Sequence, residues 1–281
     1  MRPPFAYYGG KQGAASLIVG LFPPHRVYIE PFFGSGAVFF AKPPARHETI
    51  NDLDGDVVTF FRVLRSRREE LEEVCALTPY ARAEFDAAAV DTHDDVERDR
   101  RFWVRVNQSF AKTGGSATGW SVTTGPTQSG PASVLSRQGR FRAVAERLMG
   151  VSIENCDAAE LIDRMATSDT VIYADPPYLA ETRRGRTRGR AEDYGVDMGT
   201  ESAHQRLASA LLETPATVFL SGYNSPLYDE LYASWPRLEV PVRVHSSNPV
   251  TQRRGDRLEV IWSNRPLTTR PTQTTLSEVA R

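Results

Sequence analysis

The alternation of short apolar runs with helical patterns near the start of this 281-residue chain constrains its fold more than any other feature. Val27–Glu30 is a β-branched and aromatic run, and a glycine-containing segment separates it from the apolar run Ala37–Phe40. A second short run, Glu48–Ile50, precedes the helically spaced segment Asp54–Leu64. Strand, helix and strand in this order form a βαβ unit with parallel strands. The pattern therefore predicts an α/β fold.

The α/β pattern resumes after residue 150. Amphipathic spacing predicts helices at residues 202–212 and 227–232. Apolar runs predict strands at residues 151–155, 170–174, 217–221, 237–244 and 258–264. We therefore expect two halves of one domain, at residues 1–61 and 146–281.

The segment between these halves differs in composition. Residues 84–99 carry seven acidic side chains and one basic one, whereas residues 101–147 carry seven basic side chains and one acidic one. Residues 111–131 are mostly Gly, Ser and Thr, few of which could build a core. Segregated charge and a Gly-rich stretch are typical of a binding insertion. We predict a smaller inserted domain at residues 62–145.

The motif Asp175-Pro176-Pro177-Tyr178 directly follows one of the predicted strands, at the sheet edge where ligands bind. The Asp175 carboxylate and a main-chain carbonyl of the Pro-Pro turn could hold both N–H bonds of an exocyclic amino group of adenine or cytosine. Its lone pair would then point at an electrophilic methyl group. The prolines fix the backbone, and Tyr178 offers a stacking face for an extruded base. The alternative is a plain surface turn.

Gly34 and Gly36 mark a tight loop between the first strand and its helix. The loop lacks the dinucleotide pattern, because Phe39 stands where a third glycine is expected. It suits a cofactor whose amino-acid part, rather than a phosphate, approaches the backbone. Asp52 follows Glu30 by 22 residues, where a doubly wound fold places the acid that binds ribose hydroxyls. A helix N-cap is the other interpretation of Asp52.

Taken in order, these motifs resemble the Dam-type family (D12 class, group alpha) of S-adenosylmethionine-dependent DNA adenine-N6 methyltransferases, especially its phage and prophage members. The resemblance covers the catalytic segments nearly end to end and leaves out the insert. It rests on Tyr7–Lys11, Pro31–Gly36, Asn51-Asp52, Asp157, Asp175–Tyr178, Leu220–Ser225 and Arg257–Asn264. The bulky Tyr8 departs from the small residue that often stands at that position.

The resemblance implies a Rossmann-like methyltransferase fold, with a mixed sheet flanked by helices and an inserted target-recognition domain. It implies site-specific methylation, with S-adenosylmethionine as cofactor, of the N6 amino group of a flipped adenine in double-stranded DNA. Asp52 would contact the ribose region and Asp157 the adenine amino group of the cofactor. The implied catalytic residues are Asp175, Pro176, Pro177 and Tyr178, and the implied cofactor-binding residues are Tyr7, Lys11, Phe32, Gly34, Ser35, Gly36, Asp52, Asp157 and Asp175.

The formal net charge of −1 gives no overall field that attracts DNA, so local basic clusters would have to bind it. Five arginines lie within eight residues shortly after Tyr178, and we expect them to neutralise phosphates beside the extruded base. An accidental cluster in an arginine-rich chain is the alternative. The expected DNA-binding residues are Arg183, Arg184, Arg186, Arg188, Arg190, Lys112, Arg137 and Arg140.

Several function classes are disfavoured. Neither the two cysteines nor the five histidines show metal-ligand spacing, so we expect no metal site. The N-terminus lacks the apolar core of a signal peptide, and no stretch approaches the ~20 apolar residues of a membrane span. We therefore expect a cytoplasmic protein with DNA, not a membrane, as its partner, and a cognate restriction endonuclease as a further candidate partner.

Three alternative functions stay open. Cytosine-N4 transfer would use the same acceptor geometry, although that class more often has Ser where Asp175 stands. An RNA or protein amide methyltransferase could use the same chemistry but seldom needs an insert of this size and charge. A non-enzymatic DNA-binding protein would have no reason to keep the intact acid, prolines and tyrosine.

Overall fold

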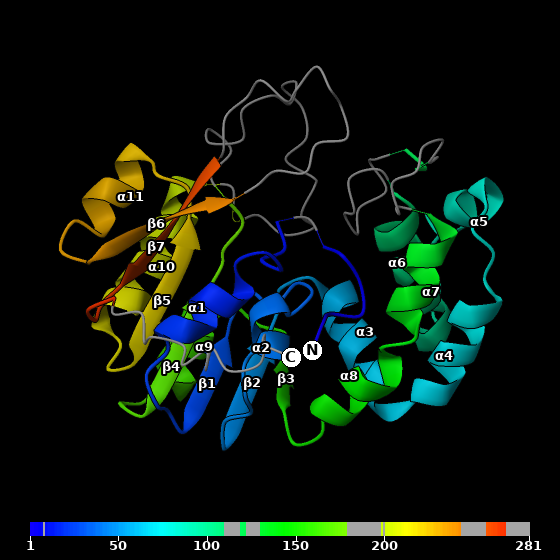
Figure 1. Ribbon diagram of the computed structural model, residues 1–281, viewed down its shortest axis with the longest axis horizontal. Coiled ribbons are helices and arrows are strands. Elements are labelled where there is room, and N and C mark those ends of the chain that lie inside the picture. Colours follow the sequence, from blue (N-terminus) through cyan, green and yellow to red (C-terminus); the bar gives the residue numbers. More distant parts are fainter. Residues whose placement is uncertain are drawn as a thin grey trace, which may run out of the picture.

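The computed structural model describes residues 1–7, 9–109, 119–121, 130–178, 198, 200–242 and 257–267. Its centre is a seven-stranded sheet with the order β3-β2-β1-β4-β5-β7-β6 (Figure 1). The strands are β1 Val27–Glu30, β2 His47–Asn51, β3 Ser152–Glu154, β4 Thr170–Ala174, β5 Thr217–Gly222, β6 Arg237–Val242 and β7 Arg257–Ser263.

The sheet is mixed, as the family resemblance implies. Strands β1 to β5 are parallel, with Ile29 of β1 opposite both Thr49 of β2 and Ile172 of β4. Strand β7 is antiparallel to β5 and to β6. The strand order reverses between β1 and β4, because the chain first adds β2 and β3 on one side and then β5 to β7 on the other. Such a reversal opens a crevice at the carboxyl ends of the two strands.

Helices cover both faces of the sheet. Successive side chains of a strand point to opposite faces, so Val171 and Tyr173 of β4 join one buried cluster while Ile172 and Ala174 join the other. The helices are α1 Ala15–Leu21, α2 Ala37–Ala41, α3 Gly55–Ser66, α4 Arg68–Leu77, α5 Arg82–Ala87, α6 Asp95–Gln108, α7 Pro131–Gln138, α8 Phe141–Arg147, α9 Ala158–Met165, α10 Glu201–Glu213 and α11 Pro226–Leu231. Helices α1, α2, α3 and α8 contribute to the first cluster, and α9 to α11 to the second.

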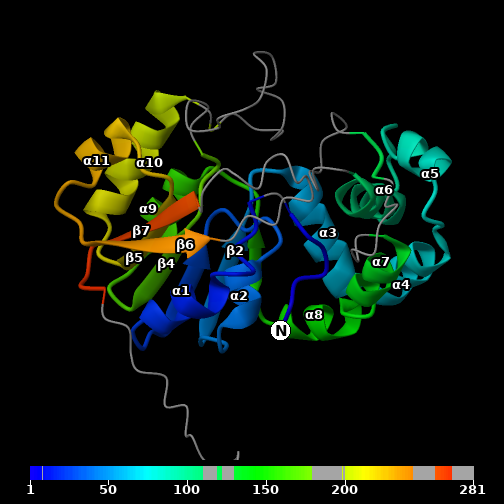
Figure 2. The same cartoon turned by 45° about the horizontal axis from the view of Figure 1, so that its top comes forward.

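Helices α4 to α7 stand together beyond the β3 edge of the sheet, and α10 and α11 lie at the other end of the molecule, in both views (Figures 1 and 2). They pack on α3 mainly through α6 and α4. The predicted domain boundary between residues 61 and 62 falls inside α3, which continues because Val63 and Leu64 are as buried as Phe60 and Phe61. The second predicted boundary, between residues 145 and 146, likewise falls inside α8.

The inserted helices share a core with the sheet helices. Leu71 of α4 and Phe102 and Trp103 of α6 belong to the same buried cluster as Phe60 of α3 and Tyr28 of β1. The division into two domains therefore stays a prediction from composition. Within the described ranges, the helices are all too short or too polar to cross a membrane.

Candidate active site

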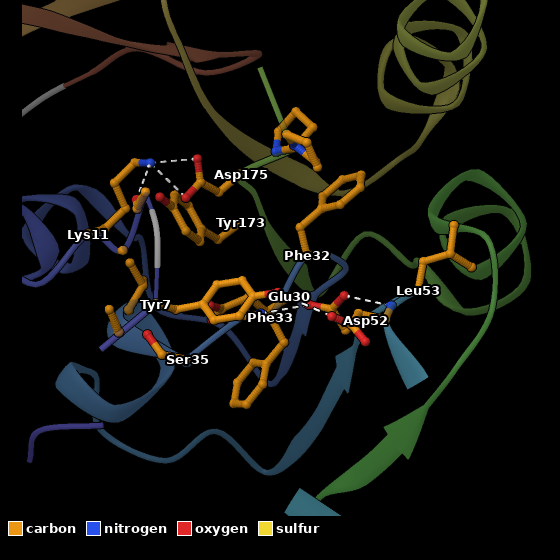
Figure 3. Close-up of a pocket in the computed structure, with 18 of the residues that line it drawn as sticks. Tyr7, Lys11, Glu30, Phe32, Phe33, Ser35, Asp52, Leu53, Tyr173 and Asp175 are labelled. Carbon is orange, nitrogen blue, oxygen red and sulfur yellow. Dashed lines mark hydrogen bonds and ion pairs between the residues drawn. The ribbon is translucent and has the colours of Figure 1, made fainter. Parts of the chain in front are cut away.

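A cavity opens at the carboxyl ends of β1 and β4, where the strand order reverses (Figure 3). Lys11 and Asp175 lie at one end of it, and Asp52 and Leu53 at the other. The described residues that line it are Tyr7, Gly9, Gly10, Lys11, Glu30, Phe32, Phe33, Gly34, Ser35, Ala37, Val38, Asp52, Leu53, Asp54, Tyr173, Asp175, Pro176, Pro177, Tyr178 and Met198. Most residues that the sequence assigns to catalysis and cofactor binding are thus brought together.

The loop between β1 and α2 forms one wall. Gly34 and Gly36 both have positive φ, 48° and 72°, which glycine adopts without strain. A Cβ atom at Gly36 would lie only 2.4 Å from the Phe33 ring. Gly36 does not line the cavity itself, so it shapes the loop that Gly34 and Ser35 present to the cavity.

Asp52 lies in the cavity wall and does not cap the following helix. Its Oδ2 accepts the Gly34 N–H at 2.7 Å, and its Oδ1 accepts the Asp54 N–H at 3.0 Å. The N-cap of α3 is Asp54, which accepts the Asp56 N–H. Burial raises the pKa of Asp52 to about 7, although the two amides oppose the shift. The carboxyl can therefore change charge near neutral pH.

Lys11 bridges the catalytic motif. Its Nζ donates to Oδ1 and Oδ2 of Asp175, both at 2.7 Å, and to the Tyr178 hydroxyl at 2.6 Å. The Tyr178 hydroxyl donates in turn to Oε1 of Glu259 at 2.8 Å, and this oxygen lies 3.0 Å from the ammonium. One cation, two carboxylates and a phenol therefore form a closed cluster.

The charges of this cluster depend on one another. Burial alone would lower the pKa of Lys11, but the attraction of Asp175 and Glu259 outweighs it and the pKa is raised. Burial raises the pKa of Asp175, while Lys11 opposes this shift and Glu259 adds to it. Lys11 therefore stays an ammonium and occupies the Asp175 oxygens that a bound amino group would need.

The Tyr178 ring is fixed on a second side. Its centroid lies 4.3 Å from that of Tyr223, with a tilt of 41° between the planes. Tyr223 comes directly after β5. The Lys11 ammonium lies 5.1 Å from the Tyr178 ring centroid, within cation–π range. Both Tyr223 and Glu259 fall in segments that carry the family resemblance, but the sequence gives neither a role.

Sequence reasoning also missed Glu30 as a site residue. Glu30 ends β1, lines the cavity and accepts the Tyr28 hydroxyl at 2.6 Å. Burial raises the pKa of Glu30 to about 8 against the opposing effect of this hydrogen bond. A single acid at the end of an apolar strand was the available signal, since ligand-facing side chains lie at that edge.

Asp157 lies outside the cavity lining. It caps α9, with Oδ1 accepting the Ala159 and Glu160 N–H groups at 3.0 and 3.2 Å, and its Oδ2 pairs with Arg206. The structure thus accounts for Asp157 as a helix cap, and its contact with a cofactor stays a prediction from the resemblance.

Two of the expected DNA-binding residues make contacts within the protein. Arg137 of α7 donates to Oδ1 of Asn107 at 2.8 Å, and Arg140 donates to the Pro3 carbonyl at 2.9 Å. These bonds tie the segment around α7 to α6 and to the N-terminus. The other expected residues, Lys112, Arg183, Arg184, Arg186, Arg188 and Arg190, lie outside the described residues.

Comparison with known proteins points to one family. Residues 7–246 match the family of D12 class N6 adenine-specific DNA methyltransferases. The Type II methyltransferase M1.LlaDCHI of Lactococcus lactis subsp. cremoris is 24% identical over 282 residues, covering 94% of this chain and 95% of the relative.

Two solved structures show a distant likeness. The first is precorrin 8W decarboxylase from Methanobacterium thermoautotrophicum, with a TM-score of 0.40 and 8% identity, covering 94% of this chain and 98% of the other. The second is Thermoplasma acidophilum 1320, with a TM-score of 0.35 and 8% identity, covering 90% and 96%. Similarity this low carries no functional information.

Proposed function

The chain belongs to the family of D12 class N6 adenine-specific DNA methyltransferases, and from this premise we propose that the cavity beside Asp175 binds S-adenosylmethionine and that the Asp175–Tyr178 motif activates the adenine amino group. The activity is methyl transfer to adenine N6 in DNA. The observation that carries the residue assignment is the cluster of Lys11, Asp175 and Tyr178 at one end of the cavity. The family match favours adenine over cytosine-N4 and over an RNA or protein amide.

The charge of the cavity supports this cofactor. Among the described residues that line it, four are acidic, Glu30, Asp52, Asp54 and Asp175, and one, Lys11, is basic. Glu30, with a pKa of about 8, is mainly protonated at neutral pH, but the other three acids still outnumber Lys11. Such a lining suits a ligand with positive groups and disfavours phosphate. S-adenosylmethionine fits, since it carries an ammonium and a sulfonium and no phosphate; when bound, it supplies an electrophilic methyl group. Asp52 and Asp54 would accept hydrogen bonds from ribose hydroxyls, and Phe32 and Leu53 would contact the apolar faces.

Asp175 and the Pro-Pro turn act on the adenine. The exocyclic nitrogen is a poor nucleophile because its lone pair is delocalised into the ring. Asp175 would accept one of its N–H bonds and a main-chain carbonyl of the turn the other, which directs the lone pair at the methyl carbon. The prolines hold these acceptors in place before the base arrives. The new N–C bond would replace the bond between the methyl carbon and the cofactor sulfur, and the electron pair of that bond would stay on sulfur. The nitrogen then has a proton to lose, and Asp175 is the base in contact with it.

Tyr178 would hold the adenine after it leaves the duplex. An amino group inside a base pair cannot reach a carboxylate that lies in a cavity of the protein, so the base must be extruded. The Tyr178 ring, fixed by Tyr223 and by its hydroxyl contacts, offers a rigid face for stacking. The helices α4 to α7 stand beside the sheet and would form the target-recognition part, together with the arginines predicted from the sequence.

Methyl transfer from labelled S-adenosylmethionine to unmethylated genomic DNA tests this function. We expect the label only in N6-methyladenine after digestion to nucleosides, and only at one sequence context. A fluorescent adenine analogue at that position should brighten when protein is added. Label in cytosine, or transfer without extrusion of the base, would contradict the proposal. The Type II relative supports the further proposal that the methylated site is one that a cognate restriction endonuclease cleaves.

A further inference from the structure

Glu259 joins two residues of the site from outside the cavity. It lies in β7, is only 5% exposed, and is not among the described residues that line the cavity. Its Oε1 nevertheless accepts the Tyr178 hydroxyl at 2.8 Å and lies 3.0 Å from the Lys11 ammonium. Burying a carboxylate is unfavourable unless its partners compensate for the lost water. This carboxylate is therefore held in place by two residues that do line the cavity.

Asp175 and Glu259 share one ammonium. In the proposed reaction Asp175 accepts an N–H bond of adenine, and the incoming amino group competes with the Lys11 ammonium for the two Asp175 oxygens that Lys11 now holds. A buried ammonium without a carboxylate partner is strongly unfavourable. Glu259 is already in contact with Lys11, so the ammonium can turn to it with little movement.

Tyr178 depends on the same carboxylate. Its hydroxyl lies between Lys11, at 2.6 Å, and Glu259, at 2.8 Å, while its ring packs on Tyr223. If Lys11 shifts when adenine binds, the bond to Glu259 still fixes the hydroxyl end of the ring. The stacking face is then the same before and after the base enters.

We propose that Glu259 is a positioning residue of the methyl-transfer site, a role that rests on the function proposed above. It fixes the Tyr178 ring through the hydroxyl, and it takes over the Lys11 ammonium when Asp175 binds the adenine amino group. Glu259 does not touch the reacting atoms. Its replacement should therefore slow the chemical step more than it weakens DNA binding.

Glu259 also sets the charge state of its neighbours. Among the described residues, the titratable groups around it are Lys11 from the N-terminal segment, Tyr173 from β4, and Asp175 and Tyr178 from the segment after β4. Burial raises the pKa of Asp175 and the charge of Glu259 raises it further. Burial lowers the pKa of Lys11, but the charges of Asp175 and Glu259 outweigh it. Removing the Glu259 charge should lower both pKa values.

The test compares Glu259→Gln with Glu239→Gln, a control at an exposed residue of the neighbouring strand β6. We expect Glu259→Gln to lower kcat for methyl transfer about tenfold or more, the effect of one lost charge-assisted contact, with KM for DNA changed by less than about threefold. Both limbs of the pH profile of kcat/KM, which reports the pKa values of the free enzyme, should move to lower pH, which a purely structural role would not cause. The control should match the wild type in all three measurements.

A second variant, Glu259→Asp, separates the effect of the charge from the effect of the side-chain length. Glu259→Asp keeps the charge, so its pH profile should stay near that of the wild type even though kcat falls. Thermal unfolding shows which variants are folded, and Glu259→Ala, with the same expected shift of both limbs, replaces the glutamine variant if glutamine is not tolerated. In Glu259→Gln, a wild-type kcat, or a loss of kcat with neither pH limb moved, would overturn the proposal. Shifted limbs in Glu259→Asp would overturn it as well. Absence of adenine methylation by the wild type would instead refute the proposed function.

Discussion

Asp52 illustrates how surroundings decide the role of a single carboxyl. The sequence leaves two interpretations, a ribose contact and a helix N-cap, because both place an acid just after a strand. In the structure Asp54 takes the cap, and this leaves Asp52 in the cavity wall with both oxygens bound to backbone amides. The identity of the capping residue could not be read from the sequence, since Asp52 and Asp54 are both good caps.

We predict that Asp52→Asn weakens S-adenosylmethionine binding by about 1.5 to 3 kcal/mol, the value of a charge-assisted hydrogen bond. The pKa of Asp52 is about 7 in the free protein, and ribose hydroxyls donate to the ionised form. Wild-type affinity should therefore fall as the pH drops below about 7, and the variant should lose the part of this dependence that Asp52 contributes. Calorimetric titrations at pH values up to about 1.5 units below and above the Asp52 pKa measure both the affinity and its pH dependence.

The control for this titration is Asp163→Asn, at an exposed residue of α9. It should bind the cofactor like the wild type at every pH. Equal affinity of the wild type and Asp52→Asn across the range would mean that Asp52 only holds the loop through the Gly34 amide.

At the scale of elements, the loop between β1 and α2 depends on one glycine. Gly36 has a φ of 72° and leaves no room for a Cβ, which would lie 2.4 Å from Phe33 and 2.9 Å from Phe40. We predict that Gly36→Ala lowers the free energy of unfolding by about 1 to 3 kcal/mol and also weakens cofactor binding, because the loop must move. Denaturant unfolding and calorimetry measure the two effects.

Gly20→Ala in α1 is the matched control, because a Cβ there would meet nothing within 4 Å. Alanine favours helix over glycine by up to about 1 kcal/mol, so this variant should be slightly more stable. A Gly36→Ala protein as stable as Gly20→Ala would show that the loop accommodates a side chain.

Helix α6 carries a buried acid that opposes folding when charged. Asp99 is 0% exposed, and its two carboxylate oxygens have no hydrogen-bond partner among the described residues. Burial raises its pKa to about 8, Asp95 and Asp56 add to the shift, and Arg98 and Arg62 oppose it. The folded protein therefore holds a proton that the unfolded chain, with an ordinary pKa of 3.8, releases. The contribution of Asp99 to the free energy of unfolding is therefore fully present below pH 3.8. It is lost as the pH rises to about 8.

We predict that Asp99→Asn, which cannot ionise, becomes more stable relative to the wild type as the pH rises from 5 to 8, by about 1 to 3 kcal/mol at the upper end. Asp86→Asn, at an exposed residue of α5, should show no such trend. The measurement is the free energy of unfolding of each protein across that pH range. A constant difference between Asp99→Asn and the wild type would mean that Asp99 finds a partner in solution.

At the scale of the whole molecule, the sequence predicts the sheet better than the insert. Strands β1, β4 and β5 are apolar runs buried on both faces, and such runs are distinctive. Helix α4 buries only Leu71 and Cys75, and the buried residues of α6 include the polar Asp99, Asn107 and Gln108. The apolar spacing of both helices is therefore a weak pattern. The two expected domain boundaries fall inside helices α3 and α8, because a change in composition does not mark where a helix begins or ends.

The contacts within the site could not be predicted from the sequence for a different reason. Lys11 and Asp175 are 164 residues apart in sequence, and Tyr178 and Glu259 are 81 apart. Motifs placed Lys11 and Asp175 near one cofactor, but which atoms meet depends on the order of the strands. Glu259 is a single acid in an apolar strand, and only the pairing of β7 with β5 carries it to the site.

The central claim is that Asp175 activates the adenine amino group. Its most direct test is the single-turnover rate of methyl transfer to a saturating DNA substrate by Asp175→Ala, compared with the wild type and with Asp163→Ala at an exposed residue of α9. Loss of a preorganised acceptor should raise the barrier by at least ~3 kcal/mol, so we predict a rate at least about 100-fold lower in a folded protein that still binds DNA, and a normal rate for Asp163→Ala. A rate for Asp175→Ala within about threefold of the wild type would remove this carboxylate from the mechanism.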